Sequence, residues 1–563
     1  MRTLISAFAL LACSVTASAQ QSLPTPQPMT AVPVAEAARP APPRLIIVLS
    51  VDQFSADLFT EYRGLFTGGL ARLAGGVVFP QGYQAHGATE TCPGHSTILT
   101  GSLPARTGII ANNWYDLSLT REDRRVYCSE DPSVEGTSSA SGRYAPSINY
   151  LLTPTLGDLM KTADPRTRVV SVAGKDRAAI MMGGRAADEL WWLSPTGLSS
   201  YRGREASPHV ARISAAVVAA VGTARPALDL PQQCAARSRA VDIGGGHSVG
   251  TGRFERPAGN FRGFMASPEA DGAVLAAGAS LRSVHQLGQG PQTDLLILGL
   301  SATDYVGHTY GTEGSEMCLQ MLALDRELGD FFTRMDASGV DYAVMLTADH
   351  GGHDLPERNQ QNAAPSATRV DRGLDASALS TRLKAELGIT IDGPLLYGDA
   401  PFGDYYLSRS LSAADRARVL SAATQIIAAH PQVDRVVPGA TLAAMPIPHG
   451  NPEQWSVEQR LRASYMAGRS GDFLVALKAR VTPIPETGVG YVATHGSVWD
   501  YDRRVPMLFW RAGMRSFEQP NPVMTVDILP TLAGLIGLPI ETRNLDGRCL
   551  DLVAGEGTSC PAP

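Results

Sequence analysis

The sequence predicts an α/β fold: a doubly wound, mostly parallel sheet with helices on both faces and with capping insertions. Four short segments are nearly continuous apolar runs, which is typical of parallel strands covered on both faces. Polar residues follow these runs, and segments with helical periodicity separate them. The runs are 44–52, 168–174, 294–301 and 342–348. With 563 residues and 44% hydrophobic content, the chain can build a large core.

Helical patterns at 154–161, 317–335 and 525–538 alternate with the apolar runs. A further run at 505–510 has Pro506 near its beginning. Proline cannot donate a ladder hydrogen bond, so this run is expected at the sheet edge or at a strand start.

Two stretches interrupt the alternation of strands and helices. Residues 186–290 contain a helical pattern at 210–221, and residues 356–488 contain two more, at 379–387 and 413–430. We expect both stretches to be insertions that cap the carboxyl edge of the sheet, and we expect the second to form a lid. The predicted parts of the folded chain are a core at 44–355, the cap at 356–488 and the rest of the core at 489–563.

The first 43 residues predict export. Arg2, the apolar run at 4–15 and Ala17-Ser18-Ala19 are the parts of a signal peptide, residues 1–19, with cleavage after Ala19. The alternative is lipoprotein processing before Cys13, to which the preceding residues are a poor match. Residues 20–43, rich in proline and alanine, predict a disordered linker. No later run is long enough to span a bilayer, so we expect a periplasmic or secreted protein.

Charge and cysteine content narrow the class of protein further. The net charge of -6 argues against nucleic acid or an anionic membrane as the main partner. Without Cys13, six of the seven cysteines remain, and an even number in an oxidising compartment suggests disulfides. The favoured pair is Cys549–Cys560. Pairs Cys92–Cys128 and Cys234–Cys318 would complete the set, although spacing does not fix connectivity and buried free thiols are the alternative.

Thr91 lies where a helix is expected to begin. Pro93 and Gly94 open a helical segment at 95–100, and proline suits a first helical turn. Free backbone N–H groups and the positive end of the helix dipole make such a position an anion site. The alternative is that Thr91 only caps the helix.

Carboxylates and imidazoles follow three predicted strands and lie beside a fourth, a ligand set that suits Zn²⁺ or another divalent ion. Asp304 and His308 are four residues apart and would share one helical face. Asp349 and His350 are adjacent, so both reach a metal only in irregular backbone, which the two following glycines allow. Two ions roughly 4 Å apart would form a clamp for phosphoryl transfer. The candidate ligands are Asp52, Asp304, His308, Asp349, His350 and His495, with Thr91 as one more.

Lys175 and Arg177 follow the apolar run at 168–174. If the chain stays extended, the two side chains point to the same side. Arginine can fork across two phosphate oxygens, and lysine adds a point charge. Taken alone, a Lys-x-Arg pair is typical of a solvated protein surface. Beside a two-metal site, the same pair predicts recognition of a phosphate dianion.

Together these motifs resemble the alkaline phosphatase superfamily. The similarity is greatest to the branch that holds the nucleotide pyrophosphatase/phosphodiesterases and the PafA-type threonine phosphatases. It runs from about residue 44 to about residue 538, apart from the insertions. The segments that carry it are Val51-Asp52, Thr91–His95, Gly108–Asn112, Asp304–His308, Ala348–Gly351 and Thr494–Ser497.

The resemblance implies an alkaline phosphatase-like fold and a two-zinc site with Thr91 as the nucleophile. Zinc would activate the Thr91 hydroxyl for in-line attack and give a phosphothreonine intermediate. Asn112 would donate a hydrogen bond to a phosphoryl oxygen, and Lys175 with Arg177 is similar to the Lys-x-Arg pair of PafA-type monoesterases. One zinc would be held by Asp52, Asp349 and His350, and the other by Asp304, His308 and His495.

We therefore predict an exported alkaline phosphatase that acts on small phosphate monoesters with two Zn²⁺ per chain. We expect a monomer with no obligate nucleic-acid partner. The alternative is a phosphodiesterase or nucleotide pyrophosphatase on the same fold, although such relatives lack the Lys-x-Arg pair. A non-catalytic, metal-stabilised binding protein is disfavoured by the nucleophile among the ligands. The segment Cys92–His95 lacks the sulfatase pattern Cys-x-Pro-x-Arg.

Overall fold

The computed structural model describes residues 41–362, 364–488 and 490–561. The predicted signal peptide, Cys13 and nearly all of the predicted linker lie outside these residues. Within the described part of the chain, no helix is both long and apolar enough to cross a bilayer.

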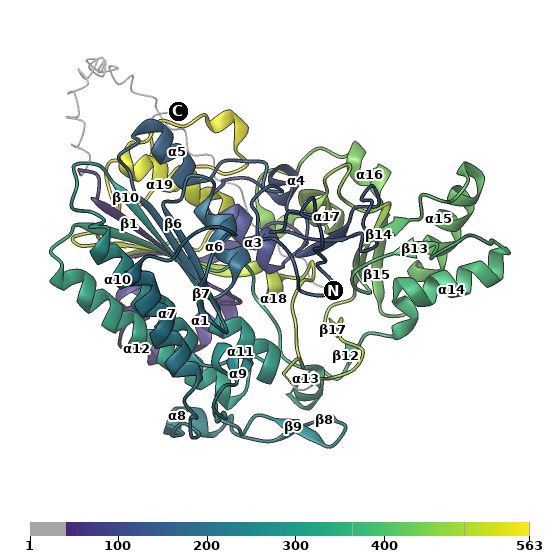
Figure 1. Ribbon diagram of the computed structural model, residues 1–563, viewed down its shortest axis with the longest axis horizontal. Coiled ribbons are helices and arrows are strands. Elements are labelled where there is room, and N and C mark those ends of the chain that lie inside the picture. The colour runs from purple at the N-terminus through teal and green to yellow at the C-terminus, as the bar shows by residue number, and fades with distance from the viewer. Residues whose placement is uncertain (1–40, 363, 489, 562–563) are drawn as a thin grey trace, which may run out of the picture. The chain divides into compact units, whose positions relative to one another are not determined.

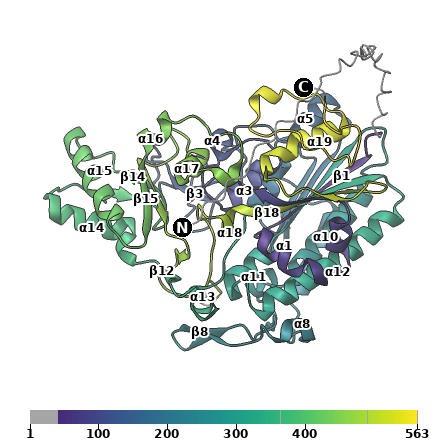
Figure 2. The same cartoon turned by 180° about the vertical axis from the view of Figure 1, so that it is seen from behind.

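A ten-stranded sheet forms the centre of the fold (Figures 1 and 2). The strands from β11 to β6 run parallel, and the sheet is extended by the antiparallel strand β18 beside β11 and the antiparallel strand β7 beside β6. This arrangement confirms the predicted fold class. The order is β19 (Phe517–Glu518), β2 (Val77–Tyr83), β18 (Arg504–Arg511), β11 (Tyr342–Thr347), β1 (Leu45–Val51), β10 (Asp294–Leu300), β5 (Val169–Ala173), β6 (Glu189–Ser194) and β7 (Gly197–Ser199), with β20 (Val523–Met524) beside β2.

Two hydrophobic cores cover the two faces of this sheet. Side chains alternate along a strand, so β1 sends Leu45, Ile47 and Leu49 into one core and Ile46 and Val48 into the other. The first core includes α1 (Ala56–Tyr62), α2 (Gly69–Ala74), α7 (Pro208–Val221), α9 (Phe261–Met265), α10 (Pro268–Val284), α11 (Ala302–Tyr310) and α12 (Ser315–Ala337). The second includes α3 (Thr91–Ile98), α5 (Leu156–Ala163), α6 (Asp176–Gly183) and α19 (Ile528–Ile536).

The register of the parallel strands places the expected site residues at one edge. Ser50 of β1 pairs with Gly299 of β10 and with Thr347 of β11. The residues that leave these strands, including Asp52 and Asp349, therefore emerge side by side, as expected for the carboxyl edge of an open α/β sheet.

Strand β18 distinguishes the two alternatives given for the run at 505–510. It lies inside the sheet, antiparallel to both β2 and β11, so the alternative of a sheet edge is wrong. Pro506 is the third residue of β18, close to the expected strand start. The register between β18 and β2 shifts between Val505 and Met507. Pro506 occupies this irregularity, where the regular ladder is broken and a missing N–H group is tolerated.

The two stretches that interrupt the alternation differ in structure. The stretch 186–290 contributes β6 and β7 to the central sheet and α10 to one of its faces. Between these elements lie α7, α8 (Gln232–Ala235), the hairpin β8 (Val241–Gly244) and β9 (His247–Val249), and α9.

Within the predicted cap at 356–488, residues 372–477 form a separate four-stranded sheet with its own core, and the name cap refers to these residues from here on. A lid role for it stays a prediction. Its elements are β13 (Leu396–Tyr397), β14 (Gly403–Leu407), β16 (Phe473–Leu477), β15 (Val433–Pro438), α14 (Ala376–Leu387), α15 (Ala413–Ala428), α16 (Gly439–Ala444) and α17 (Val457–Ser464).

The remaining α-helices and strands are short. They are α4 (Pro104–Thr107), α13 (Pro356–Asn362), α18 (Asp500–Arg503), β3 (Asn113–Tyr115) with β4 (Arg125–Tyr127), and β12 (Thr368–Arg369) with β17 (Val481–Thr482). All three expected disulfides form: Cys92–Cys128, Cys234–Cys318 and Cys549–Cys560.

Candidate active site

Thr91 is the first residue of α3, and its side chain is buried. The helix therefore begins four residues before the expected segment at 95–100, with Pro93 in its first turn. The Thr91 Oγ1 atom lies 3.4 Å from Lys175 Nζ and 3.4 Å from an Arg177 guanidinium nitrogen. The hydroxyl thus sits between two cations at the positive end of a helix.

Lys175 and Arg177 reach Thr91 by a different route from the one the sequence suggests. The chain does not stay extended here, because Lys175 is the N-cap of α6 and Arg177 lies in its first turn. The two side chains converge because α6 packs against α3.

A cage of hydroxyl groups holds the residue between Lys175 and Arg177. The Tyr127 hydroxyl donates to Asp176 Oδ1 over 2.8 Å, and the Tyr144 hydroxyl donates to Asp176 Oδ2 over 2.7 Å. Tyr127 also accepts a hydrogen bond from Arg177 over 3.3 Å. Burial raises the pKa of Tyr127, so the phenol keeps the proton that it donates.

The candidate metal ligands form two buried clusters. Asp52, Asp349 and His350 make one, and Asp304, His350 and His495 make the other, with ligand atoms within 4.8 Å of one another in each. Within the described ranges His350 belongs to both clusters and His308 to neither, although His308 Nε2 lies 3.3 Å from Asp304 Oδ1. Asp304 and His308 share one face of α11, as expected.

The orientation of the imidazoles fits a bound cation. The Nδ1 atoms of His308, His350 and His495 lie 2.7, 2.8 and 2.8 Å from backbone carbonyl oxygens, so Nδ1 carries a proton. In the neutral rings of His308 and His350, Nε2 then presents a lone pair to the carboxylates. Nε2 of His350 lies 3.4 Å from Asp52 Oδ1, and neither atom has a hydrogen-bond partner among the described residues. Such facing acceptors need a cation between them, which matches a site for divalent ions.

One cavity of about 660 Å³ opens onto three of the candidate ligands, Asp304, His308 and His495. Loops and helices of the core and residues of the cap both contribute to its wall. The lining includes Asn112, Lys175, Arg177, Asp304, His308 and His495 from the core and Asp399 to Phe402 from the cap.

Comparison with known proteins identifies the family. The sequence model described as type I phosphodiesterase/nucleotide pyrophosphatase matches residues 46–497. Alkaline phosphatase PhoK of Sphingomonas sp is 56% identical over 92% of this chain and 93% of its own length. Alkaline phosphatase PhoD of Zymomonas mobilis is 47% identical over 92% of this chain and 89% of its own. The crystal structure of wild-type alkaline phosphatase PafA superposes with a TM-score of 0.78 at 25% identity, covering 92% of this chain and all of that one.

The chain is a PafA-type alkaline phosphatase of this family.

Lys175 links the two ligand clusters of the phosphatase. Its Nζ atom lies 2.6 Å from Asp52 Oδ2 and 2.5 Å from Asp304 Oδ2, in a place from which solvent is excluded. Burial acts against the charge of Asp304, but His308 and Lys175 hold the pKa of this carboxyl well below its usual range. Burial and the charge of Asp349 raise the pKa of Asp52. Burial also lowers the pKa of His350 to about 3 and of His308 to about 4, so both rings are neutral and available as ligands.

Gln53 is a site residue that sequence reasoning missed. Its backbone has a positive φ of 64°. This turn aims the backbone N–H at Asp349 Oδ1, 3.1 Å away, and the side-chain amide at Asp304 Oδ1, 3.2 Å away. Its place directly after Asp52 was the available signal, but nothing local indicates that it bridges two carboxylates.

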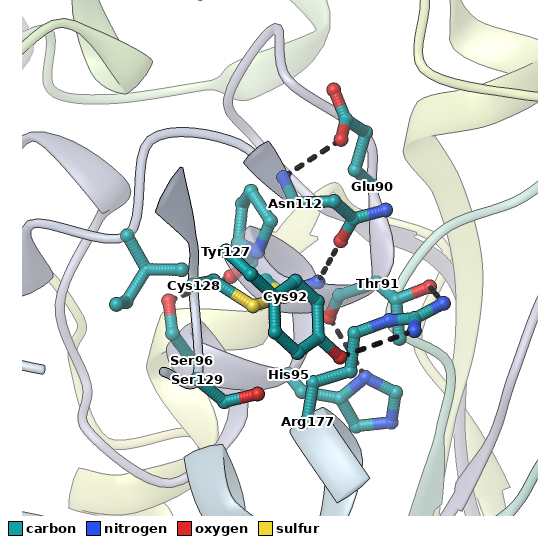
Figure 3. Close-up of a disulfide and its surroundings, with 12 residues drawn as sticks. Glu90, Thr91, Cys92, His95, Ser96, Asn112, Tyr127, Cys128, Ser129 and Arg177 are labelled. Atoms are coloured by element: carbon teal, nitrogen blue, oxygen red, sulfur yellow. Dashed lines mark hydrogen bonds between the residues drawn. A yellow bond between two sulfur atoms is a disulfide. The ribbon is translucent and has the colours of Figure 1, made fainter. Parts of the chain in front are cut away.

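Glu90 and Tyr127 were also missed. Glu90 accepts a hydrogen bond from the backbone N–H of Asn112, and Tyr127 accepts one from Arg177 (Figure 3). Each contact joins segments that are distant in the sequence, so no sequence motif indicates it. His95 belongs to the recognised motif and lies 3.1 Å from Asp349 Oδ2.

Proposed function

We propose that this alkaline phosphatase is exported and hydrolyses phosphate monoesters through a phosphothreonine intermediate on Thr91, at a site that holds two zinc ions. One observation carries the proposal: Lys175 and Arg177 each lie 3.4 Å from the buried Thr91 hydroxyl oxygen. A phosphoryl group bonded to that oxygen would meet both cations at the positive end of the α3 dipole.

The ligand atoms described above support two divalent ions. Bound ions would act as Lewis acids that favour the alkoxide form of the threonine and stabilise the leaving oxygen. Asp52, Asp349 and His350 would hold one ion, and Asp304, His308 and His495 the other. Nitrogen and carboxylate ligands without thiolates suit Zn²⁺.

The residues of the chain then account for the first half of the reaction. The Thr91 oxygen forms a bond to phosphorus while the bond from phosphorus to the alcohol oxygen breaks. The proton lost by Thr91 passes to water, and the departing alcohol takes up a proton from water, so protons balance. Arg177 and Lys175 stay beside the phosphoryl oxygens as their charge redistributes, and Asn112 donates a hydrogen bond to one of them.

The second half regenerates the enzyme. Water attacks phosphorus, the bond from phosphorus to the Thr91 oxygen breaks, and Thr91 recovers a proton. Inorganic phosphate leaves through the cavity. Lys175 and Arg177 serve both halves of the reaction, because the phosphoryl group stays beside them throughout.

The charge of the substrate separates this proposal from its rival. A monoester dianion carries one more negative charge than a diester, and two cations beside the nucleophile favour the dianion. The description of the matched family includes phosphodiesterases, so the diesterase activity deserves a direct measurement.

The test compares kcat/KM for an aryl phosphate monoester with kcat/KM for the matching diester, on zinc-loaded enzyme at alkaline pH. A ratio far above one supports the phosphatase, and a ratio below one favours the diesterase. Thr91→Ala should lose most turnover and remain folded. Near-wild-type activity of this variant would exclude Thr91 as the nucleophile.

Export has its own support and its own test. The three disulfides fit an oxidising compartment. Amino-terminal sequencing of the exported protein should begin at Gln20. A lipid-modified Cys13 at the amino terminus would instead establish the lipoprotein alternative.

A further inference from the structure

Three hydrogen bonds hold Asn112: two join it to the start of α3, at Glu90 and Cys92, and one joins it to Cys128. Its backbone N–H donates to Glu90 Oε2 over 2.8 Å. Its backbone carbonyl accepts from the Cys128 N–H over 2.9 Å. Its side-chain oxygen accepts from the Cys92 N–H over 2.8 Å, as Figure 3 shows.

These bonds fix the orientation of the Asn112 amide. The backbone N–H of Cys92 can only donate, so the side-chain oxygen of Asn112 must face it. The amide NH₂ group then keeps its hydrogens for another acceptor. Because Asn112 lines the same cavity as Lys175 and Arg177, that acceptor can be a phosphoryl oxygen.

The N-cap residue of a helix usually accepts the capping hydrogen bond with its own side chain, but at α3 Glu90 and Asn112 share this role. Glu90 is the N-cap of α3, yet its side chain makes no capping hydrogen bond to the described helix. The Glu90 carboxylate turns to the backbone of Asn112, and the side chain of Asn112 caps the helix instead. Thr91 lies between the two bonded residues of α3, so this exchange sets the place of Asn112 relative to the nucleophile.

The disulfide completes a closed ring of bonds that includes the backbone of Thr91. Cys92 is bonded covalently to Cys128, and the Cys128 backbone is hydrogen-bonded to Asn112. Asn112 therefore cannot shift without breaking a hydrogen bond to a segment that is itself tied to α3.

We propose that Glu90 is a positioning residue, which holds Asn112 so that its amide meets the phosphoryl group; this role rests on the phosphatase chemistry proposed for Thr91. Glu90 acts through its acceptor oxygen and not through its charge. Glutamine offers the same oxygen at the same distance, whereas alanine offers none. A direct contact of the Glu90 carboxylate with substrate would make the charge matter, and the two substitutions separate these roles.

The experiment is a double-mutant cycle on the zinc-loaded, full-length enzyme. The variants are Glu90→Ala, Glu90→Gln, Asn112→Ala and the double variant Glu90→Ala/Asn112→Ala. We expect Glu90→Ala to lower kcat/KM for an aryl phosphate by about 10- to 100-fold, as misplacement of a binding group does. Glu90→Gln should stay close to wild type, and the double variant should be no worse than Asn112→Ala alone.

A second measurement avoids turnover altogether. The inhibition constant of inorganic phosphate should rise in Glu90→Ala by a similar factor and stay near wild type in Glu90→Gln. Thermal unfolding and a count of free thiols verify that each variant is folded with Cys92–Cys128 intact. If Glu90→Ala does not fold, Glu90→Asp replaces it, because the shorter side chain withdraws the acceptor.

Two results would overturn the proposal. Losses that add in the double variant would mean that Glu90 acts independently of Asn112, and a loss in Glu90→Gln equal to that in Glu90→Ala would mean that its charge is what matters. The proposed function fails separately, through near-wild-type activity of Thr91→Ala.

Discussion

The carboxylate of Asp271 accepts a hydrogen bond from the backbone N–H of Ala302 over 2.9 Å and so caps the helix that carries Asp304 and His308. Its second oxygen accepts from the Gln320 amide over 2.9 Å. The side chain is fully buried on α10, and it lies outside the cavity lined by Lys175 and Arg177. A buried carboxyl group therefore fixes the position of α11 from behind.

This carboxyl group predicts a pH dependence of stability. Burial raises the pKa of Asp271 from 3.8 to about 7. Between those pH values the folded protein keeps a proton that the unfolded chain loses, so the group's contribution to the free energy of unfolding falls as pH rises. Asp271→Asn cannot ionise and should gain stability relative to wild type as pH rises from about 4 to about 8, by at most about 4 kcal/mol.

Urea unfolding of both proteins across that pH range measures the difference. Asp330→Asn, on the exposed face of α12, serves as the matched control. A difference between Asp271→Asn and wild type that does not change with pH would show that the carboxyl group is already ionised in the folded protein.

Tyr127 should matter for monoesters through Arg177. Its hydroxyl accepts from Arg177 and donates to Asp176, whereas the Tyr144 hydroxyl bonds only Asp176 among the described side chains. Tyr127→Phe is expected to lower kcat/KM for a monoester about tenfold, the equivalent of one hydrogen bond to a charged group. The diester value should change much less, and Tyr144→Phe should have the smaller effect on both. Equal losses on monoester and diester in Tyr127→Phe would contradict this role.

Much of this fold could be predicted, because strands that are buried on both faces appear in the sequence as nearly continuous apolar runs. The run that became β1 is apolar at nearly every position, and its end locates Asp52 at the ligand-binding edge. The four-residue spacing of Asp304 and His308, which places both on one face of a helix, is also visible directly in the sequence. Confirmed elements include α5, α7, α12, α14 and α15, which begin within a few residues of their expected positions.

The remainder depends on contacts that a linear pattern does not contain. Pro506 fits inside the sheet only because β18 shifts register on β2. The hydroxyl of Tyr127 meets Asp176 across 49 residues of sequence, and Glu90 meets Asn112 across 22. Arg177 reaches Thr91 from a helix and not from an extended segment, because packing of α6 on α3 decides the geometry.

Gln53 should tune metal affinity without being a ligand. It donates to one carboxylate of each cluster, and such hydrogen bonds orient ligands before a metal binds. Gln53→Ala keeps the backbone donor but loses the side-chain bond to Asp304. Competition with a zinc chelator should show about 10- to 100-fold weaker binding at one of the two sites. Unchanged affinity at both sites would show that Asp304 needs no such support.

Lys175 should stabilise the metal-free enzyme more than it stabilises the zinc-loaded enzyme. In the structure described here its ammonium group lies between the buried carboxylates of Asp52 and Asp304 and balances their charge. Removing one partner of a buried ion pair typically destabilises by about 3–5 kcal/mol, because the other charge is left uncompensated. Bound divalent cations would neutralise the same carboxylates, so Lys175→Met should lower the Tm of the chelated enzyme more than that of the zinc-loaded enzyme.

Differential scanning calorimetry of both forms gives the comparison, with Arg166→Met, an exposed cation paired with Asp164, as the control for general loss of charge. Substrate preference, in contrast, should depend on Lys175 in the zinc-loaded enzyme. Zinc-loaded Lys175→Met should be folded and yet have a reduced preference for monoesters over diesters. An equal drop in Tm with and without zinc would mean that Lys175 remains paired with the carboxylates when metal is bound. It could not then turn to the phosphate, and dianion recognition would rest on Arg177 alone.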